Sequence, residues 1–115
     1  MQRGEIWYAD LEPVRGPEAN KVRPVVIVSH NGANARATAL GRGVVTIVPV
    51  TSNTAAVRSF QVLLPAGETG LPLTTKAQAE QVRSLDVTRL HARAGQVPTP
   101  LMARLDAALR LHLDL

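Results

Sequence analysis

Hydrophobic residues recur along this chain in short runs, and their spacing predicts strands over most of its length. Residues Glu5–Leu11 alternate between apolar and polar side chains, as a half-buried strand does. The runs Pro24–Val28 and Val44–Val50 are almost wholly apolar, which is typical of strands buried on both faces. Further strands are expected over 59–64 and 76–82, and loops rich in proline and glycine over 13–22 and 66–75.

The C-terminal segment changes to a helical period. Thr99-Pro100 is typical of a helix start, because threonine can cap the first turn and proline fits within it. From Leu101 onward the apolar stripe is wider than contact with one sheet needs, which suggests that the helix also meets a second subunit. A short helical turn is expected over 31–38. Without long helices between the strands, the pattern favours a mainly β (α+β) fold, a small barrel with a C-terminal α-helix.

Length and composition narrow the class of protein. The 115 residues are expected to form a single domain over 1–115. Without cysteine, the chain has no disulfide framework, thiolate zinc site or cysteine nucleophile. No histidine pair stands at ligand spacing with a carboxylate, so neither a metal site nor a cofactor is expected. The apolar runs are too short to span a membrane and the N-terminus lacks an apolar signal region, so we expect a cytoplasmic protein.

The positive charge of the chain is concentrated in one segment. The net charge is +4, and residues 31–65 carry three arginines and no acidic residue. Eleven of the thirteen basic residues are arginine, whose planar guanidinium matches the geometry of phosphate. A basic segment of this kind fits a nucleic-acid contact, although a solvated basic face would look the same.

Two residue pairs at the edges of the apolar runs carry the candidate chemistry. Arg23-Pro24 begins one run and Thr51-Ser52 ends the other. A guanidinium and two hydroxyls at the mouths of neighbouring strands would bind a phosphate, with Arg23 stabilising developing charge and the hydroxyls donating hydrogen bonds. Glu18 and Glu80 are the candidate general bases for cleavage of RNA. The plainer alternatives are a surface ion pair for Arg23 and a strand-end cap for the hydroxyls.

Six motifs in this order resemble the MazF/PemK family of toxin endoribonucleases. They are Gly4-Glu-Ile-Trp7, Asp10-Leu-Glu-Pro13, Gly16-Pro-Glu18, Arg23-Pro-Val-Val-Ile-Val28, Pro49-Val-Thr-Ser52 and Gln81-Val-Arg-Ser-Leu-Asp86. The resemblance runs through nearly the whole chain. It implies an SH3-like barrel, a homodimer, and metal-independent cleavage of single-stranded RNA that leaves a 2′,3′-cyclic phosphate. It also implies inhibition by an acidic, MazE-like antitoxin.

The resemblance assigns roles to individual residues. Arg23 matches the catalytic arginine of the family and Thr51 its catalytic hydroxyl, while Glu18 and Glu80 match acidic positions. Two positions differ from one branch of the family. That branch has a histidine at the position of Pro17, and at the position of Gln78 it has an arginine proposed as the general acid. Arg23 would then have to serve as the acid or otherwise stabilise the leaving group. The candidate RNA-binding residues are Ser52, Asn53, Arg58, Phe60, Lys76, Gln81 and Arg83.

Two other functions fit the same fold. A gyrase-poisoning toxin of the CcdB type shares the barrel, but its activity depends on an apolar-aromatic C-terminus, and this chain ends Leu113-Asp114-Leu115 without tryptophan. A barrel that serves only as an interaction module would not need Arg23, Thr51 and Glu18 together. With three aromatic residues in the chain, base stacking is not expected to be the main mode of RNA binding.

Overall fold

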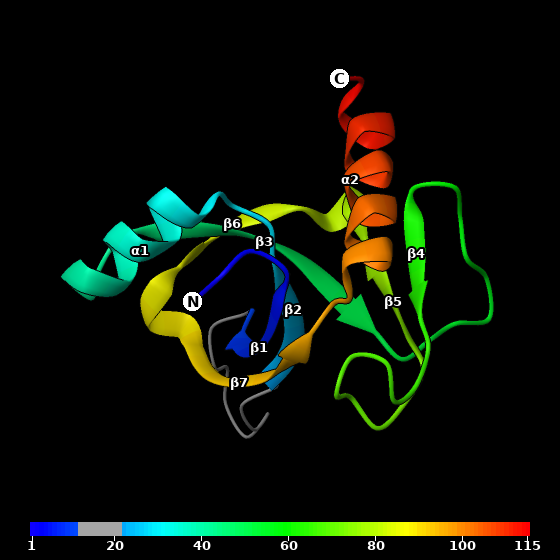
Figure 1. Ribbon diagram of the computed structural model, residues 1–115, viewed down its shortest axis with the longest axis horizontal. Helices are drawn as coiled ribbons and strands as arrows, with labels where there is room; N and C mark the ends of the chain where they lie inside the picture. Colours follow the sequence, from blue (N-terminus) through cyan, green and yellow to red (C-terminus); the bar gives the residue numbers. More distant parts are fainter. Residues whose placement is uncertain (12–21) are drawn as a thin grey trace, which may run out of the picture.

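The computed structural model describes residues 1–11 and 22–115 of the chain (Figure 1). The predicted loop over 13–22 therefore lies outside the described residues, apart from Val22. In the described residues the elements run, in order, β1 (Glu5–Asp10), β2 (Val22–Ile27), α1 (Asn31–Leu40), β3 (Val44–Thr51), β4 (Gln61–Leu64), β5 (Thr75–Gln78), η1 (Ala79–Gln81), β6 (Arg83–Asp86), η2 (Val87–Arg89), β7 (Leu90–Gln96) and α2 (Thr99–Leu113).

The strands form one antiparallel sheet in the order β4-β5-β3-β2-β1-β7. β3 is the longest strand, and on one side it pairs with β6 through Val44–Ile47 and then with β5 through Val50–Thr51. This mainly β fold with a C-terminal helix confirms the predicted class. The sheet path is open, however, because β4 and β7 stand at its two ends, so the expected barrel is a strongly curved sheet that does not close.

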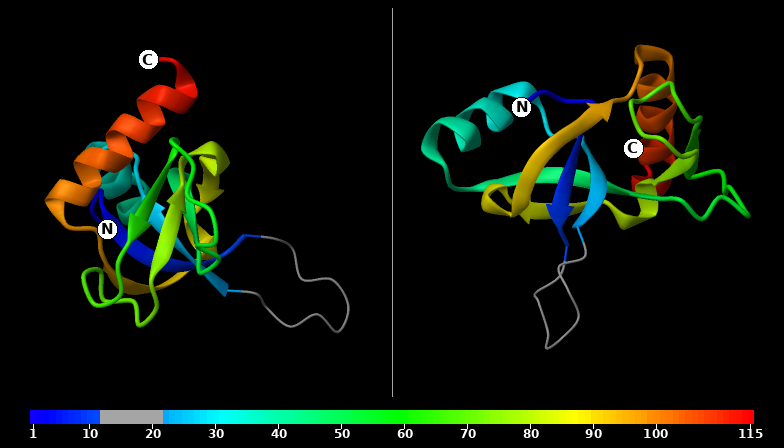
Figure 2. Two further views of the ribbon diagram at one scale, coloured as in Figure 1. Left: turned by 90° about the vertical axis from the view of Figure 1, so that its right-hand side faces the viewer. Right: turned by 90° about the horizontal axis from the view of Figure 1, so that it is seen from below.

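The apolar strands are buried on both faces because the curved sheet encloses two separate core clusters. Val26 and Val48 point into a cluster that α2 covers, with Leu105 and Ala108 packed from the helix. Val25 and Ile47, one residue along each strand, point into a second cluster that includes Ala37 of α1. Figure 1 and the right-hand view of Figure 2 show that the helices lie at opposite ends of the sheet. The almost continuous apolar runs of β2 and β3 follow from this double cover.

Both helices differ in detail from the prediction. The expected turn at 31–38 is a ten-residue helix, and the His30 side chain caps it by accepting a hydrogen bond from the Ala33 N–H (3.3 Å). The cap position of α2 is Pro98 and carries no side-chain hydrogen bond, so the prediction of a Thr99 cap is wrong. No helix of the described residues is long and apolar enough to cross a membrane.

Some strand boundaries also differ from the predicted ones. The strand expected from Ser59 begins at Gln61, and the strand expected from Lys76 to Val82 ends at Gln78, where the chain turns into η1. β6 and β7 were not predicted. β7 pairs with β1, and β6 pairs with β3, so both strands are stabilised by partners distant in the sequence.

Candidate functional site

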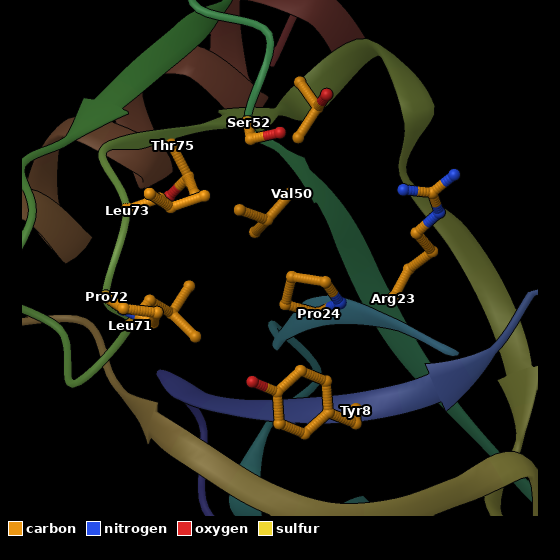
Figure 3. Close-up of a pocket in the computed structure, with 10 residues that line it drawn as sticks. Tyr8, Arg23, Pro24, Val50, Ser52, Leu71, Pro72, Leu73 and Thr75 are labelled. Atoms are coloured by element: carbon orange, nitrogen blue, oxygen red, sulfur yellow. The ribbon is translucent and has the colours of Figure 1, made fainter. Parts of the chain in front are cut away.

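An open pocket of about 200 Å³ lies at the ends of β2 and β3, and it brings together three of the predicted site residues, Arg23, Thr51 and Ser52 (Figure 3). Its lining residues are Tyr8, Arg23, Pro24, Val50, Thr51, Ser52, Leu71, Pro72, Leu73 and Thr75. The pocket therefore has a polar edge next to an apolar interior.

The pairing of β2 with β3 explains why Arg23 and Thr51 line the same pocket. β2 and β3 pair antiparallel with Val25 opposite Pro49 and Ile27 opposite Ile47. Arg23 and Thr51 each stand two residues beyond the pair Val25–Pro49, at the same end of the two strands, and both line the pocket there. Figure 3 shows the Arg23 side chain at the edge of the pocket, with its guanidinium directed away from the Tyr8 ring.

The Thr51 hydroxyl is held in place by a turn at the end of β3. Its Oγ1 accepts a hydrogen bond from the Asn53 N–H (3.2 Å), and the Asn53 side chain in turn accepts one from the Ala55 N–H (3.3 Å). Local hydrogen bonds of this kind are typical of turns that threonine and asparagine start. Because Oγ1 acts as an acceptor here, its own hydrogen remains available to a ligand.

The far wall of the pocket is the loop from 65 to 74, which docks on β7 at Gly95. A Cβ at Gly95 would stand 1.9 Å from the Thr69 carbonyl oxygen, so only glycine permits this approach. The Gln96 N–H donates to that same carbonyl (2.9 Å), and Thr69 Oγ1 accepts from the Leu71 N–H (3.3 Å). These contacts hold Leu71 and the two residues after it against the pocket.

The interior of the pocket contains a polar group without a partner. Thr75 is only 5% exposed, and its Oγ1 makes no hydrogen bond with any of the described residues. Tyr8 also lines the pocket and is 36% exposed. The sequence analysis missed both residues as site residues. The alternation of the first strand could have marked Tyr8, but nothing in the local sequence distinguishes Thr75.

The structure does not bring Glu80 to this pocket. Its Oε2 accepts a hydrogen bond from Gln61 Nε2 (2.7 Å), while its Oε1 is buried without a partner among the residues described. Gln61 also accepts from the Arg58 N–H (2.9 Å), so Glu80 belongs to a polar cluster at the start of β4. Glu18, the other carboxylate candidate, lies outside the described residues.

The remaining candidates differ in their exposure and in the groups that they contact. Lys76 is 9% exposed and its ammonium donates to the Ala56 carbonyl (2.5 Å), so it holds the loop after β3. Phe60 is half-buried, with its ring centroid 6.4 Å from that of His112. Arg83 is exposed and donates to the Leu11 carbonyl (3.1 Å). Ser52, Asn53, Arg58 and Gln81 are exposed.

The charge at the pocket is positive and uncompensated within the part of the chain that the structure describes. Ion pairs there join Arg3 to Asp106 (2.7 Å) and Arg93 to Glu5 (3.7 Å), His91 Nε2 lies 2.8 Å from a carboxylate oxygen of Asp10, and none of these contacts involves Arg23. The same residues contain no group of three acidic or histidine side chains placed to hold a metal ion. The polar edge of the pocket therefore suits an anion.

Residues 2–113 match the family described as PemK-like, MazF-like toxin of type II toxin–antitoxin system. The chain belongs to this family. A relative named Endoribonuclease MazF9, from Mycobacterium tuberculosis, is 60% identical over 115 residues, which is all of this chain and 98% of that protein.

Solved structures of MazF-type proteins share the fold. MazF of Deinococcus radiodurans superposes with a TM-score of 0.77 at 25% identity and covers 100% of this chain and 97% of its own. A mycobacterial endoribonuclease in complex with its cognate antitoxin gives a TM-score of 0.78 at 24% identity, over 100% of this chain and 96% of that one. The mainly β sheet with one C-terminal helix is thus the architecture of MazF-like toxins.

Proposed function

We propose that this chain is the toxin of a type II toxin–antitoxin pair and acts as an endoribonuclease on single-stranded RNA, as one toxin domain over 1–115. The convergence of Arg23 and Thr51 on one pocket carries the proposal, because a guanidinium and a hydroxyl at one edge suit a phosphate. The name of its 60% identical relative, an endoribonuclease, supports the same activity. Neither the gyrase-poison nor the binding-module alternative is favoured by that relationship.

The proposed reaction is a transesterification within the RNA backbone. The ribose 2′-oxygen attacks the adjacent phosphorus, the new O2′–P bond forms and the P–O5′ bond breaks, which leaves a 2′,3′-cyclic phosphate and a free 5′-hydroxyl. Glu18 accepts the 2′-hydroxyl proton, and water supplies the proton to the leaving 5′-oxygen. We assign the base to Glu18 rather than Glu80 because the Glu80 carboxylate is bound by Gln61 away from the pocket.

Arg23 and Thr51 stabilise the charge that develops in this reaction. The negative charge on the non-bridging oxygens grows as phosphorus becomes five-coordinate, and fixed donors aimed at those oxygens favour the transition state over the bound substrate. Arg23 supplies a permanent charge and Thr51 a neutral donor. These side chains perform the reaction without a metal ion or another cofactor, because the guanidinium takes the role of the cation.

The RNA strand extends beyond the pocket over exposed polar and basic side chains. Ser52 and Asn53 follow Thr51 at the end of β3, and Arg58 and Arg83 are exposed cations. Contacts of this kind to phosphate oxygens position the strand rather than read its sequence. Gln81, Phe60 and Lys76 are further predicted contacts. The Lys76 ammonium also donates a hydrogen bond to the Ala56 carbonyl, which positions the loop after β3.

The proposed partners are an acidic, MazE-like antitoxin and a second copy of the chain. The relative solved with its cognate antitoxin supports the first, and the net charge of +4 fits an acidic partner. Leu111 and Leu113 at the end of α2 and Leu115 just after it are exposed, which supports a homodimer through this end of the helix. The site of action is the cytoplasm, where the RNA substrate is found.

The proposed activity is tested by incubating the purified protein with a long RNA in the presence of a chelator. The expected products end in 2′,3′-cyclic phosphates on one side and 5′-hydroxyls on the other. Mapping the 5′-ends then gives the sequence at which the RNA is cut. An RNA that stays intact, or products with 5′-phosphates, would contradict the proposed chemistry.

A further inference from the structure

The pocket contains more apolar surface than binding of a phosphate requires. Arg23, Thr51 and Ser52 occupy its edge, whereas Tyr8, Pro24, Val50, Leu71, Leu73 and Thr75 line its interior. We call this interior the base pocket. In Figure 3 the rings of Tyr8 and Pro24 stand on one side of it and Leu71 stands across from them. A charged backbone gains nothing from such a surface, but a nucleobase does.

Thr75 gives an independent indication of a ligand. Thr75 lines the base pocket and is only 5% exposed, and its hydroxyl is buried with no hydrogen-bond partner among the described residues. Buried polar groups are almost always paired, and an unpaired one costs free energy that a ligand would recover. A hydroxyl can donate or accept, so it suits the polar edge of a base.

The size of the pocket limits the base. Its volume of about 200 Å³ is below the roughly 300–1,000 Å³ of sites that bind drug-sized ligands. The pocket is therefore of a size for a single base, and a six-membered ring leaves more clearance in it than a fused double ring. The Tyr8 ring supplies a flat aromatic face, on which bases stack without regard to sequence.

We propose that the base pocket binds the pyrimidine of one nucleotide that flanks the scissile phosphate, and that the Thr75 hydroxyl contacts the polar edge of that pyrimidine. The pocket adjoins Arg23 and Thr51, so the bound base belongs to a nucleotide next to the reacting phosphorus. This inference rests on the proposed function for its substrate. It makes Thr75 and Leu73 specificity-determining residues rather than catalytic ones.

The test combines cleavage with a binding measurement that needs no cleavage. Short RNAs that contain one mapped cut site are prepared with each base, or no base, at the two flanking positions. We expect removal of the base at one of these positions to lower kcat/KM by about tenfold, and a purine there to do the same. Leu73→Trp should fill the pocket from its rim, where Leu73 is 62% exposed and tolerates a larger side chain. For this variant, kcat/KM should fall by about tenfold on the complete RNA and should not change on the RNA without that base.

Thr75→Val tests the hydroxyl. We expect it to lower kcat/KM on the RNA that carries the pyrimidine by about three- to tenfold, and Thr75→Ser to retain the wild-type value. Thr46→Val is the matched control, because Thr46 is also a strand threonine but does not line the pocket. Two results would overturn the base pocket. One is equal cleavage of the RNAs with and without the base, and the other is an equal fall in the cleavage of both RNAs by Leu73→Trp.

The binding measurement separates this inference from the nuclease proposal. The probes are two dinucleotides that cannot be cut, one of 2′-deoxyuridines and one of 2′-deoxyadenosines. NMR titration with the first should shift the amide signals of Leu71, Leu73 and Thr75, and Leu73→Trp should abolish these shifts. If RNA is not cut but the shifts occur, the nuclease proposal fails and the base pocket stands. If RNA is cut and the shifts are confined to Arg23 and Thr51, the base pocket fails.

Discussion

Arg23 and Thr51 line one pocket from the neighbouring antiparallel strands β2 and β3, and each stands two residues beyond the pair Val25–Pro49. Arg23 precedes and Thr51 follows a strand segment that is buried on two faces, so the backbone next to each residue is rigid. Fixed donors at the site of developing charge need no reorganisation during the reaction, which is the main source of their effect. The curved sheet therefore acts as the scaffold for a phosphate site.

The first prediction concerns the Thr51 hydroxyl. Thr51→Val should lower the rate of RNA cleavage about a hundredfold, because one donor to the transition state is lost. It should also lower the free energy of unfolding by about 1 kcal/mol, because the hydrogen bond to the Asn53 N–H is lost. Thr51→Ser should keep both the cleavage rate and the free energy of unfolding of the wild type, because serine retains the hydroxyl. Single-turnover rates and denaturant unfolding check the two effects, and a Val variant that cuts as fast as the Ser variant would remove Thr51 from the mechanism.

The second prediction separates the two carboxylates. Glu18→Gln should abolish most cleavage, because the general base is lost. Glu80→Gln should cut RNA at the wild-type rate, since the new amide can still accept the hydrogen bond from Gln61 Nε2. The cleavage rates of the two variants, measured side by side, check this. The opposite result would make Glu80 the base in spite of its distance from the pocket.

The sequence predicted the parts of the fold that local patterns control. β1, β2, β3 and α2 follow from alternation, apolar runs and helical period, because each buries a face that its own residues define. β7 was missed although Leu90–Ala94 alternates between apolar and polar residues, because its apolar positions after Leu90 are alanine, which favours strands only weakly, and its pairing with β1 decides its conformation. The length of α1 was underestimated because its sequence has almost no apolar stripe.

In the candidate site, too, local sequence patterns predicted some residues, whereas others depend on contacts between distant segments. Arg23 and Thr51 could be predicted because each stands at the end of a strand with a clear sequence signal. The base pocket could not, since its wall comes from a loop whose position depends on the contact between Thr69 and Gly95. Glu80 stands just after a strand, which made it a candidate catalytic residue, yet the turn at η1 directs its carboxylate toward Gln61.

The third prediction concerns salt. Each phosphate contact to a single strand contributes a slope of about −0.7 to the dependence of log affinity on log salt. With Arg23, Arg58 and Arg83 as contacts, the slope should be about −2. Arg58→Ala should make the slope shallower by about 0.7, whereas Arg104→Ala, on the exposed face of α2, should leave it unchanged. Binding of uncut RNA analogues at several salt concentrations measures this, and a flat response would exclude the basic side chains as the RNA track.

The fourth prediction concerns Glu5 and pH. Burial of the Glu5 carboxyl raises its pKa, but hydrogen bonds from the Trp7 indole and the Gln2 N–H, together with the Arg93 charge, bring the net pKa below its ordinary value of 4.5. A carboxyl with a lower pKa in the folded state stabilises the fold above the unfolded pKa, and the contribution is lost as pH falls through the folded pKa.

The variant Glu5→Gln should therefore lose less unfolding free energy than the wild type between neutral pH and about pH 3. Glu68→Gln is the control, because Glu68 is exposed in the loop from 65 to 74. Denaturant titrations at each pH provide the comparison. Parallel acid profiles for the wild type and Glu5→Gln would show that the Trp7 contact does not hold the carboxylate.

The most direct test of the proposed nuclease is the cleavage rate of Arg23→Ala in the presence of a chelator. Arg23 is exposed, so its removal should leave the fold intact, which circular dichroism can verify. The account predicts a fall of about a hundredfold or more in the single-turnover rate, with Arg104→Ala as active as the wild type. An Arg23→Ala protein that folds and cuts RNA within a few-fold of the wild-type rate would contradict the account.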